Sequence, residues 1–278
     1  MPGTVLIVEG NTRATSARIA GFGAQPYAES FAELLSGLAP GLACTIVRPA
    51  DEGPDCLPPG KAFHDYDGIV WTGSALNCYD AIPSVTDQLT MARAAYASGV
   101  PIFGSCWGLQ VFVTALGGAV RRNPRGREIG FARAITLTPA GARHPMYAGK
   151  GPSFDAFAVH VDEVEQLPAG ATVLASNAMS RVQAAVVETD GCSFWGLQYH
   201  AEFDFRTMAV VHRRLADNLI EENLYADEQA VESAACDFEA MPDGAPGLLR
   251  RYAVAPHMLD GGHRTLELKN WLLGKVLR

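Results

Sequence analysis

Residues 100–118 read VPIFGSCWGLQVFVTALGG and join two different patterns at a cysteine. Residues 100–105 form a short apolar run that predicts a buried strand. Residues 107–118 have the apolar spacing of a helix that ends at two glycines. A strand, a tight Gly-x-Cys-x-Gly turn and a helix are together typical of a nucleophile elbow, in which the turn holds the central residue in a strained conformation. The stretch therefore makes Cys106 a candidate nucleophile.

The position of Cys106 beside a helix N-terminus favours the thiolate, because the helix dipole stabilises negative charge there. The backbone N–H groups at that terminus can also face a developing oxyanion. A small core cysteine that follows an apolar strand produces the same local pattern. This stretch alone leaves both interpretations open.

Strands and helices alternate through the first 118 residues. Apolar runs predict further strands at 4–10, 42–49 and 66–74, and helical spacing predicts helices at 27–40 and 84–99. This alternation predicts an α/β fold with a mostly parallel central sheet that is flanked by helices.

The second half of the chain has a different rhythm. We expect short strands at 129–138, 154–161, 171–176, 182–188 and 193–199, and then a helix at 206–224. The remainder is an acidic stretch followed by an amphipathic helix at 265–278. The chain therefore divides into a domain of residues 1–224 and a helical C-terminal extension of residues 225–278.

The composition is that of a soluble globular protein, since 48% of the 278 residues are hydrophobic and 19% are charged. A formal net charge of −8 argues against a nucleic-acid or anionic-membrane surface, which would favour a basic face. No apolar run approaches the roughly 18 residues of a spanning helix. The opening residues MPGTVLIVEG lack the basic segment of a signal peptide. The six cysteines form no CxxC pair, which favours reduced thiols and a cytoplasmic location.

A second chemical signal lies in residues 194–204, which read FWGLQYHAEFD. An apolar strand ends at His200, and Glu202 follows two positions later. Side chains two apart in an extended chain project to the same side, so Glu202 can approach His200 and fix its tautomer. A surface histidine beside an acid is the alternative. Because both this stretch and Cys106 fall at strand ends, where open α/β sheets hold their sites, they predict a Cys-His-Glu triad.

Four stretches within residues 4–205 resemble the class I glutamine amidotransferases. The stretch GSCWGLQ (104–110) resembles the family's G-x-C-x-G-x-Q, and GLQYHAE (196–202) resembles its G-x-Q-F-H-P-E. Between them, RGREIGF (125–131) resembles the family's strand after the nucleophile helix. The stretch VHVDEVEQLPAGATVLASN (159–177) resembles a further family segment, and all four stretches occur in the family's order. The likeness extends to the glutaminase part of GMP synthases and their free-standing relatives. It implies a flavodoxin-like α/β fold.

The resemblance implies a role for each member of the triad. Cys106 would attack the side-chain amide carbonyl of glutamine, and His200 would take the thiol proton and return it to the departing ammonia. Glu202 would orient His200. The N–H groups of Gly73 and Trp107 would form the oxyanion hole.

The resemblance also implies a set of substrate contacts. These are Gln110, Glu128, Gly130 and Phe131, with His160 and Asp162 flanking the α-amino end of the substrate. The thioester mechanism needs no metal and no cofactor, so neither is expected. The chain departs from the family at Thr72-Gly73-Ser74, where a Gly-Gly-Pro turn is usual, at Ala201 in place of proline, and at Trp107, whose indole either narrows the pocket or packs in the core.

Three functions remain open at this point. The first is a glutaminase that hands ammonia to a separate synthase or ligase. The second is a free-standing γ-glutamyl peptidase or hydrolase that uses the same thioester. The third is an inactive regulatory subunit, against which the complete triad argues. The C-terminal extension either covers the sheet or mediates homodimerisation, or else docks a partner through Trp271, Leu272 and Val276.

Overall fold

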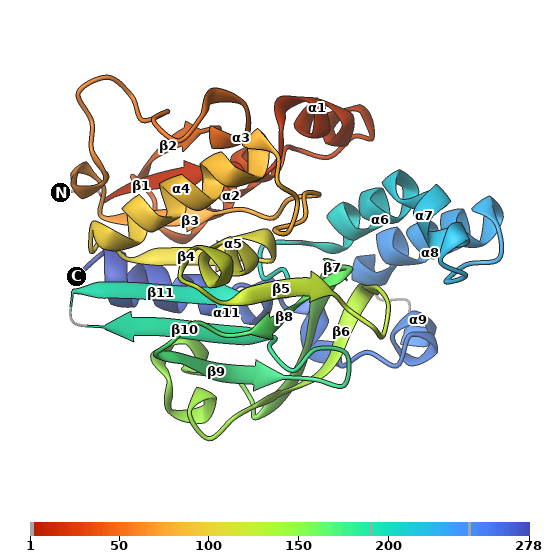
Figure 1. Ribbon diagram of the computed structural model, residues 1–278. Coiled ribbons are helices and arrows are strands. Elements are labelled where there is room, and N and C mark those ends of the chain that lie inside the picture. The colour runs from red at the N-terminus through yellow and green to blue at the C-terminus, as the bar shows by residue number, and fades with distance from the viewer. Residues whose placement is uncertain (1–2, 190, 244–245) are drawn as a thin grey trace.

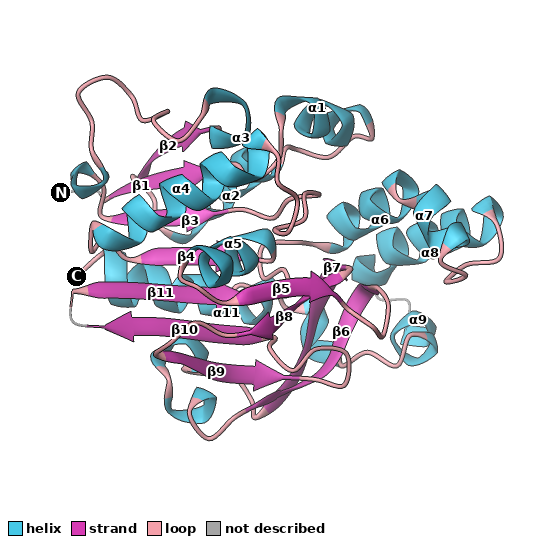
Figure 2. Cartoon of the chain, in the orientation of Figure 1, coloured by secondary structure: helices cyan, strands magenta, loops and turns pink. Residues whose placement is uncertain are grey.

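The computed structural model describes residues 3–189, 191–243 and 246–278, which form one nine-stranded sheet covered by helices (Figures 1 and 2). The strands of the sheet, in spatial order, are β2 (Ala43–Val47), β1 (Thr4–Val8), β3 (Gly68–Trp71), β4 (Ile102–Ser105), β11 (Cys192–Leu197), β10 (Ala184–Thr189), β9 (Ala171–Ser176), β6 (Glu128–Leu137) and β7 (Ser153–His160). A separate two-stranded sheet pairs β5 (Ala119–Arg122) with β8 (Asp162–Gln166).

The α-helices are α1 (Arg13–Gly21), α2 (Tyr27–Leu38), α3 (Pro49–Glu52), α4 (Pro83–Ala97), α5 (Trp107–Ala115), α6 (Phe205–Arg214), α7 (Ala216–Glu221), α8 (Glu228–Ala240), α9 (Pro246–Arg251), α10 (Gly261–Arg264) and α11 (Leu266–Trp271). Short 3-10 turns occur at Phe63–Asp65, Gly141–Arg143, Pro145–Tyr147, Met241–Asp243 and Pro256–Leu259, and a π-helical turn follows α11 at Leu272–Val276. None of the helices in the described ranges has the length and apolar character needed to cross a membrane.

The sheet is parallel in one half and antiparallel in the other. Neighbouring strands run parallel from β2 through β1, β3 and β4 to β11. From β11 to β7 every neighbouring pair is antiparallel. The expected α/β architecture with flanking helices is confirmed, and the parallel half is the half that strand–helix alternation builds. The antiparallel half is made by the closely spaced strands of the second part of the chain.

Helices cover both faces of the parallel half. Along β1, Val5 and Ile7 point into the core beneath α2 and α11, whereas Leu6 and Val8 point into the core beneath α4 and α5. All four side chains are fully buried, as expected for a parallel strand with helices on both sides. Figure 1 shows α4 and α5 in front of the sheet and α11 behind it.

A third apolar cluster lies at the β6–β7 end of the molecule. Helices α6 and α8 bury Met208 and Phe238 there against Phe131 of β6 and Phe157 of β7. The helix expected at 206–224 is divided into α6 and α7, and the acidic stretch after it contains α8.

The C-terminal segment packs into the main core. Leu268, Trp271 and Leu272 are fully buried and Val276 is nearly so, in the same cluster as Val5 and Phe31. Interpreting Trp271, Leu272 and Val276 as docking anchors for a partner is therefore wrong, because the chain's own sheet already covers them. A division of the chain at residue 224 stays a prediction.

Candidate active site

Cys106 occupies the turn between β4 and α5. Its backbone has φ 49° and ψ −96°, a conformation that costs energy for a residue with a side chain. A Cβ on Gly104 would lie 2.7 Å from the Gly108 carbonyl carbon, and one on Gly108 would lie 2.6 Å from the Trp71 carbonyl oxygen. The two glycines therefore let α5 approach the strands closely enough to form the turn.

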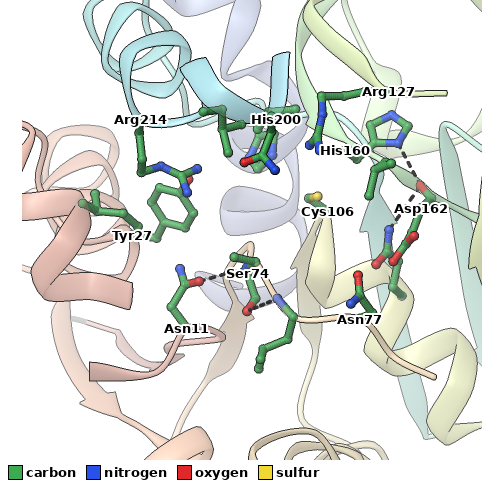
Figure 3. Close-up of a pocket in the computed structure, with 18 of the residues that line it drawn as sticks. Asn11, Tyr27, Ser74, Asn77, Cys106, Arg127, His160, Asp162, His200 and Arg214 are labelled. Carbon is green, nitrogen blue, oxygen red and sulfur yellow. Dashed lines mark hydrogen bonds between the residues drawn. The ribbon is translucent and has the colours of Figure 1, made fainter. Parts of the chain in front are cut away.

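His200 and Glu202 follow β11, the strand next to β4 in the sheet. The His200 Nδ1 atom lies 2.7 Å from Glu202 Oε1, and both side chains are almost fully buried. The other ring nitrogen, Nε2, has no hydrogen-bond partner within the described part of the chain. Cys106 and His200 both line one cavity (Figure 3). The geometry thus fixes one side of the imidazole and leaves the other free for a reacting group.

The electrostatics of His200 favour its protonated form. Burial, the largest influence, lowers its pKa, but the Glu202 carboxylate and the Cys106 sulfur outweigh it together and raise the pKa to about 10. A protonated imidazole beside the sulfur is the form that can give a proton to a leaving amine.

Two residues that the sequence did not single out hold this pair in place. The hydroxyl of Ser105 is fully buried and lies 2.8 Å and 3.0 Å from the two oxygens of Glu202, to which it donates. The ring of Phe203 stacks on the His200 imidazole, with centroids 3.9 Å apart and planes inclined by 12°. The only sequence signal for either is adjacency to a triad residue.

The two expected oxyanion donors come from different parts of the chain, the start of α5 and the loop after β3. Trp107 is the first residue of α5, and the first N–H groups of a helix have no acceptor inside it. A Cβ on Gly73 would approach His200 Cε1 to 3.0 Å, so the backbone of Gly73 lies against the imidazole. The Trp107 indole is buried in the core and donates to Gln88, so it does not narrow the pocket. The oxyanion role of both residues stays a prediction.

The cavity around Cys106 has a volume of about 330 Å³, at the small end of the range for ligand pockets. Its wall is formed by Asn11, Arg18, Ile19, Tyr27, Ser74, Ala75, Leu76, Asn77, Cys106, Gln110, Arg122, Arg127, Val159, His160, Val161, Asp162, His200, Arg214, Leu215 and Asn218. Three of the expected substrate contacts, Gln110, His160 and Asp162, are in this wall.

Glu128, Gly130 and Phe131 are not in this wall, and their expected contact with the substrate stays a prediction. Glu128 Oε2 lies 2.9 Å from His160 Nε2, so the carboxylate supports the histidine from behind. Gly130 faces Phe238, and Phe131 stacks on the same ring at 5.0 Å. The structure thus places the β6 residues in the supporting layer and in the third apolar cluster.

Charges are distributed unevenly around the cavity. On the side of His160, Asp162 accepts a hydrogen bond from Tyr79, and burial raises the pKa of Asp162. Arg127 and Arg122 reach the same region and share the carboxylate of Glu222. On the other side of Cys106, Figure 3 shows Asn11, Tyr27 and Arg214.

The family model for class I glutamine amidotransferases matches residues 36–217. The chain belongs to the class I glutamine amidotransferase family. A γ-glutamyl-L-1-hydroxyisopropylamide hydrolase from a Pseudomonas species is 36% identical over 275 residues, which cover 96% of this chain and 91% of that protein. The GMP synthase of Symbiobacterium thermophilum is 34% identical over 135 residues, which cover 49% of this amidotransferase chain but only 24% of the synthase.

Solved structures support the amidotransferase fold. A glutamine amidotransferase from Methylobacillus flagellatus has a TM-score of 0.66 at 20% identity and covers 99% of this chain and 96% of its own. One from Thermotoga maritima has a TM-score of 0.63 at 18% identity, with 94% and 99% covered. The match to the Methylobacillus structure therefore includes the C-terminal helices of this chain.

Proposed function

We propose that this amidotransferase-family protein is a free-standing hydrolase of γ-glutamyl amides. The Cys106 thiolate attacks the γ-carbonyl carbon, and the N–H groups of Gly73 and Trp107 hold the resulting oxyanion. The intermediate collapses to a thioester as the C–N bond breaks, and the leaving amine takes a proton from His200. Water then attacks the thioester with His200 as base, and the C–S bond breaks, which releases glutamate and restores the Cys106 thiolate beside a protonated His200.

The observation that carries this proposal is that the cavity extends to both sides of the Cys106–His200 pair. One side, with Gln110, His160 and Asp162, offers polar groups for the amino-acid end of a glutamyl substrate. The other side, with Asn11, Tyr27 and Arg214, adjoins His200, where a leaving amine must be protonated. In this proposal, an amine larger than ammonia occupies that side.

Similarity over nearly the full length of a γ-glutamyl amide hydrolase supports the same assignment. A glutaminase that delivers ammonia to a separate synthase is the second candidate. It is favoured by the likeness to enzymes named glutamine-hydrolysing GMP synthases, although the match spans about a quarter of their length.

Steady-state assays of the purified protein separate the two candidates. Glutamine and γ-glutamylethylamide are each supplied without any partner protein, and released glutamate is measured. We expect the ethylamide to be cleaved with the higher kcat/KM, and the Cys106→Ala variant to cleave neither. Turnover of glutamine but not of γ-glutamylethylamide would favour the second candidate. If neither substrate is turned over, the proposal is contradicted.

A further inference from the structure

The leaving-group side of the cavity carries an unneutralised positive charge. Among the arginines of the wall, Arg122 and Arg127 share Glu222, whereas Arg18 and Arg214 have no ion-pair partner among the residues that the structure describes. Arg213 precedes Arg214 in sequence, and it forms ion pairs with Glu232 and Glu239 of α8. The positive charge of Arg214 is therefore available to a ligand bound in the cavity.

Two buried carboxylates that act on Tyr27 beside Arg214, those of Glu9 and Glu202, are held by other donors. Glu9 is fully buried and accepts from the N–H groups of Asn11 and Ala28, at 3.0 Å and 2.9 Å. Glu202 is held by Ser105 and His200. These two buried acids are thus already engaged.

The two sides of the cavity differ in the charges that they present. The side of Asp162 presents one carboxylate together with two arginines that share Glu222, so it can receive both charges of an α-amino acid. On the other side the charged group is the Arg214 guanidinium, beside the neutral side chains of Asn11 and Tyr27, and burial raises the pKa of Tyr27 to about 12. A positive site with a neutral hydrogen-bond donor suits an anion.

The Arg214 side adjoins the atom that must protonate the leaving amine. The rings of Tyr27 and His200 are 6.5 Å apart, and Figure 3 shows Arg214 and Tyr27 together on one side of Cys106, opposite Arg127 and Asp162. A leaving amine at His200 therefore directs its substituent toward Arg214.

We infer that the leaving group of the preferred substrate carries a carboxylate that binds Arg214, which makes the substrate class γ-glutamyl amino acids or peptides. This inference rests on the proposed hydrolase activity. Arginine provides the planar pair of donors that a carboxylate accepts, and a site built for that pairing discriminates against a neutral analogue.

The test compares γ-glutamylglycine with γ-glutamylglycinamide, which differ only in having a carboxylate or a carboxamide beyond the scissile bond. Glycinamide is the less basic amine and the better leaving group, so a preference for the carboxylate cannot come from leaving-group chemistry. For the wild-type protein we expect kcat/KM to be about 10- to 100-fold higher for γ-glutamylglycine, the range of one charged hydrogen bond.

In Arg214→Gln the ratio is expected to fall to about 1, while Arg206→Gln, an exposed change on the same helix, leaves it unchanged. A wild-type ratio of 1 or less would overturn the inference but leave the hydrolase assignment intact. A wild-type preference that persists in Arg214→Gln would also overturn it. Failure to cleave either dipeptide would contradict the proposed function itself.

Discussion

At the scale of single residues, the site is a chain of contacts that runs from Ser105 through Glu202 to His200. Each link is short, from 2.7 Å to 3.0 Å, and none of the three side chains is exposed enough for water to replace its partner. In the proposed mechanism, the free ring nitrogen at the end of this chain is the atom that moves protons. Ser105 is thus a positioning residue that acts through Glu202.

Removing the Ser105 hydroxyl tests this role. In Ser105→Ala we expect kcat to fall about 10-fold with little change in KM, because Glu202 loses the donor that orients it while the substrate contacts remain. Ser180→Ala, another buried serine outside the cavity wall, serves as the control. An unchanged kcat in Ser105→Ala would show that His200 alone is sufficient to hold Glu202.

The pH dependence follows from the raised pKa of His200. Since the imidazolium must donate a proton to the leaving amine, the alkaline limb of kcat/KM is expected near pH 10. In Glu202→Gln the carboxylate that raises the His200 pKa is gone, so burial lowers this pKa with less opposition. We therefore expect the alkaline limb to shift to a pH about one to three units lower. An alkaline limb at the same pH in both proteins would contradict this assignment.

The same pKa shift predicts a contribution to stability. A folded-state pKa raised above the usual 6.5 favours folding where the imidazole is protonated. This contribution is complete below about pH 6.5 and disappears as the pH rises through about 10. Urea unfolding of the wild type and Glu202→Gln across this range should show a stability difference that shrinks toward alkaline pH.

The triad could be expected from sequence because each part lies within a contiguous pattern. Ser105 could not be assigned to Glu202, because 97 positions separate the two and only the pairing of β4 with β11 joins them. The direction of the Trp107 indole also depends on Gln88 of the neighbouring helix α4, 19 positions earlier in the chain. Backbone position was thus predictable and side-chain direction was not.

At the scale of elements, the elbow depends on how closely α5 approaches β3 and β4. Gly108→Ala would force a Cβ to within 2.6 Å of the Trp71 carbonyl oxygen, so we expect a loss of about 1–3 kcal/mol in the free energy of unfolding, together with loss of activity.

The matched control is Gly37→Ala, an exposed position near the end of α2 with no atom close to the added Cβ. There the change is expected to stabilise the protein by about 0.5–1 kcal/mol. Chemical denaturation measures both variants. Equal effects at the two positions would contradict a special role for the close approach at Gly108.

Elements with an apolar pattern were predictable, and those without one were missed. The strands and helices of the parallel half lie within a few residues of their expected bounds. Helix α1 buries only Ser16 and Ile19, so it has no apolar stripe to detect. Strands β5 and β8 form a small half-exposed sheet whose pairing joins segments about 40 residues apart.

At the scale of the whole molecule, the C-terminal segment is tied to the sheet by a buried ion pair. Lys150 Nζ lies 2.8 Å from Glu267 Oε2, and both side chains are almost fully buried. Tyr199 directly precedes His200 in the chain. Its hydroxyl donates a hydrogen bond to the other oxygen of Glu267 at 2.6 Å. The extension therefore supports the end of β11 from which His200 follows.

Breaking this buried ion pair should lower the free energy of unfolding much more than breaking an ion pair on the surface. We expect Glu267→Ala to lower the free energy of unfolding by about 3–5 kcal/mol, because it leaves Lys150 buried without a counter-charge. Glu52→Ala, which removes the exposed pair with Arg13, should cost less than about 1 kcal/mol. The double variant Lys150→Met/Glu267→Leu should recover most of the loss, and failure to recover it would assign the effect to Tyr199.

The amphipathic pattern at 265–278 predicted an apolar face but not what covers it. A partner and the chain's own sheet bury such a face equally well, and only the tertiary structure shows Trp271 against Gly68. The antiparallel half of the sheet was expected as separate strands, yet its order depends on long-range pairing that local patterns do not encode.

The central claim is that Cys106 attacks a γ-glutamyl carbonyl, and covalent labelling tests it most directly. The protein is treated with a chloroketone analogue of glutamine, and the modified peptide is identified by mass spectrometry. The other five cysteines serve as internal controls, since burial raises the pKa of Cys44 and Cys78 and Cys236 is exposed. We expect one label, on Cys106, that excess γ-glutamyl substrate prevents and that abolishes turnover. A label on another cysteine with Cys106 unmodified, or full turnover by Cys106→Ala, would contradict the account.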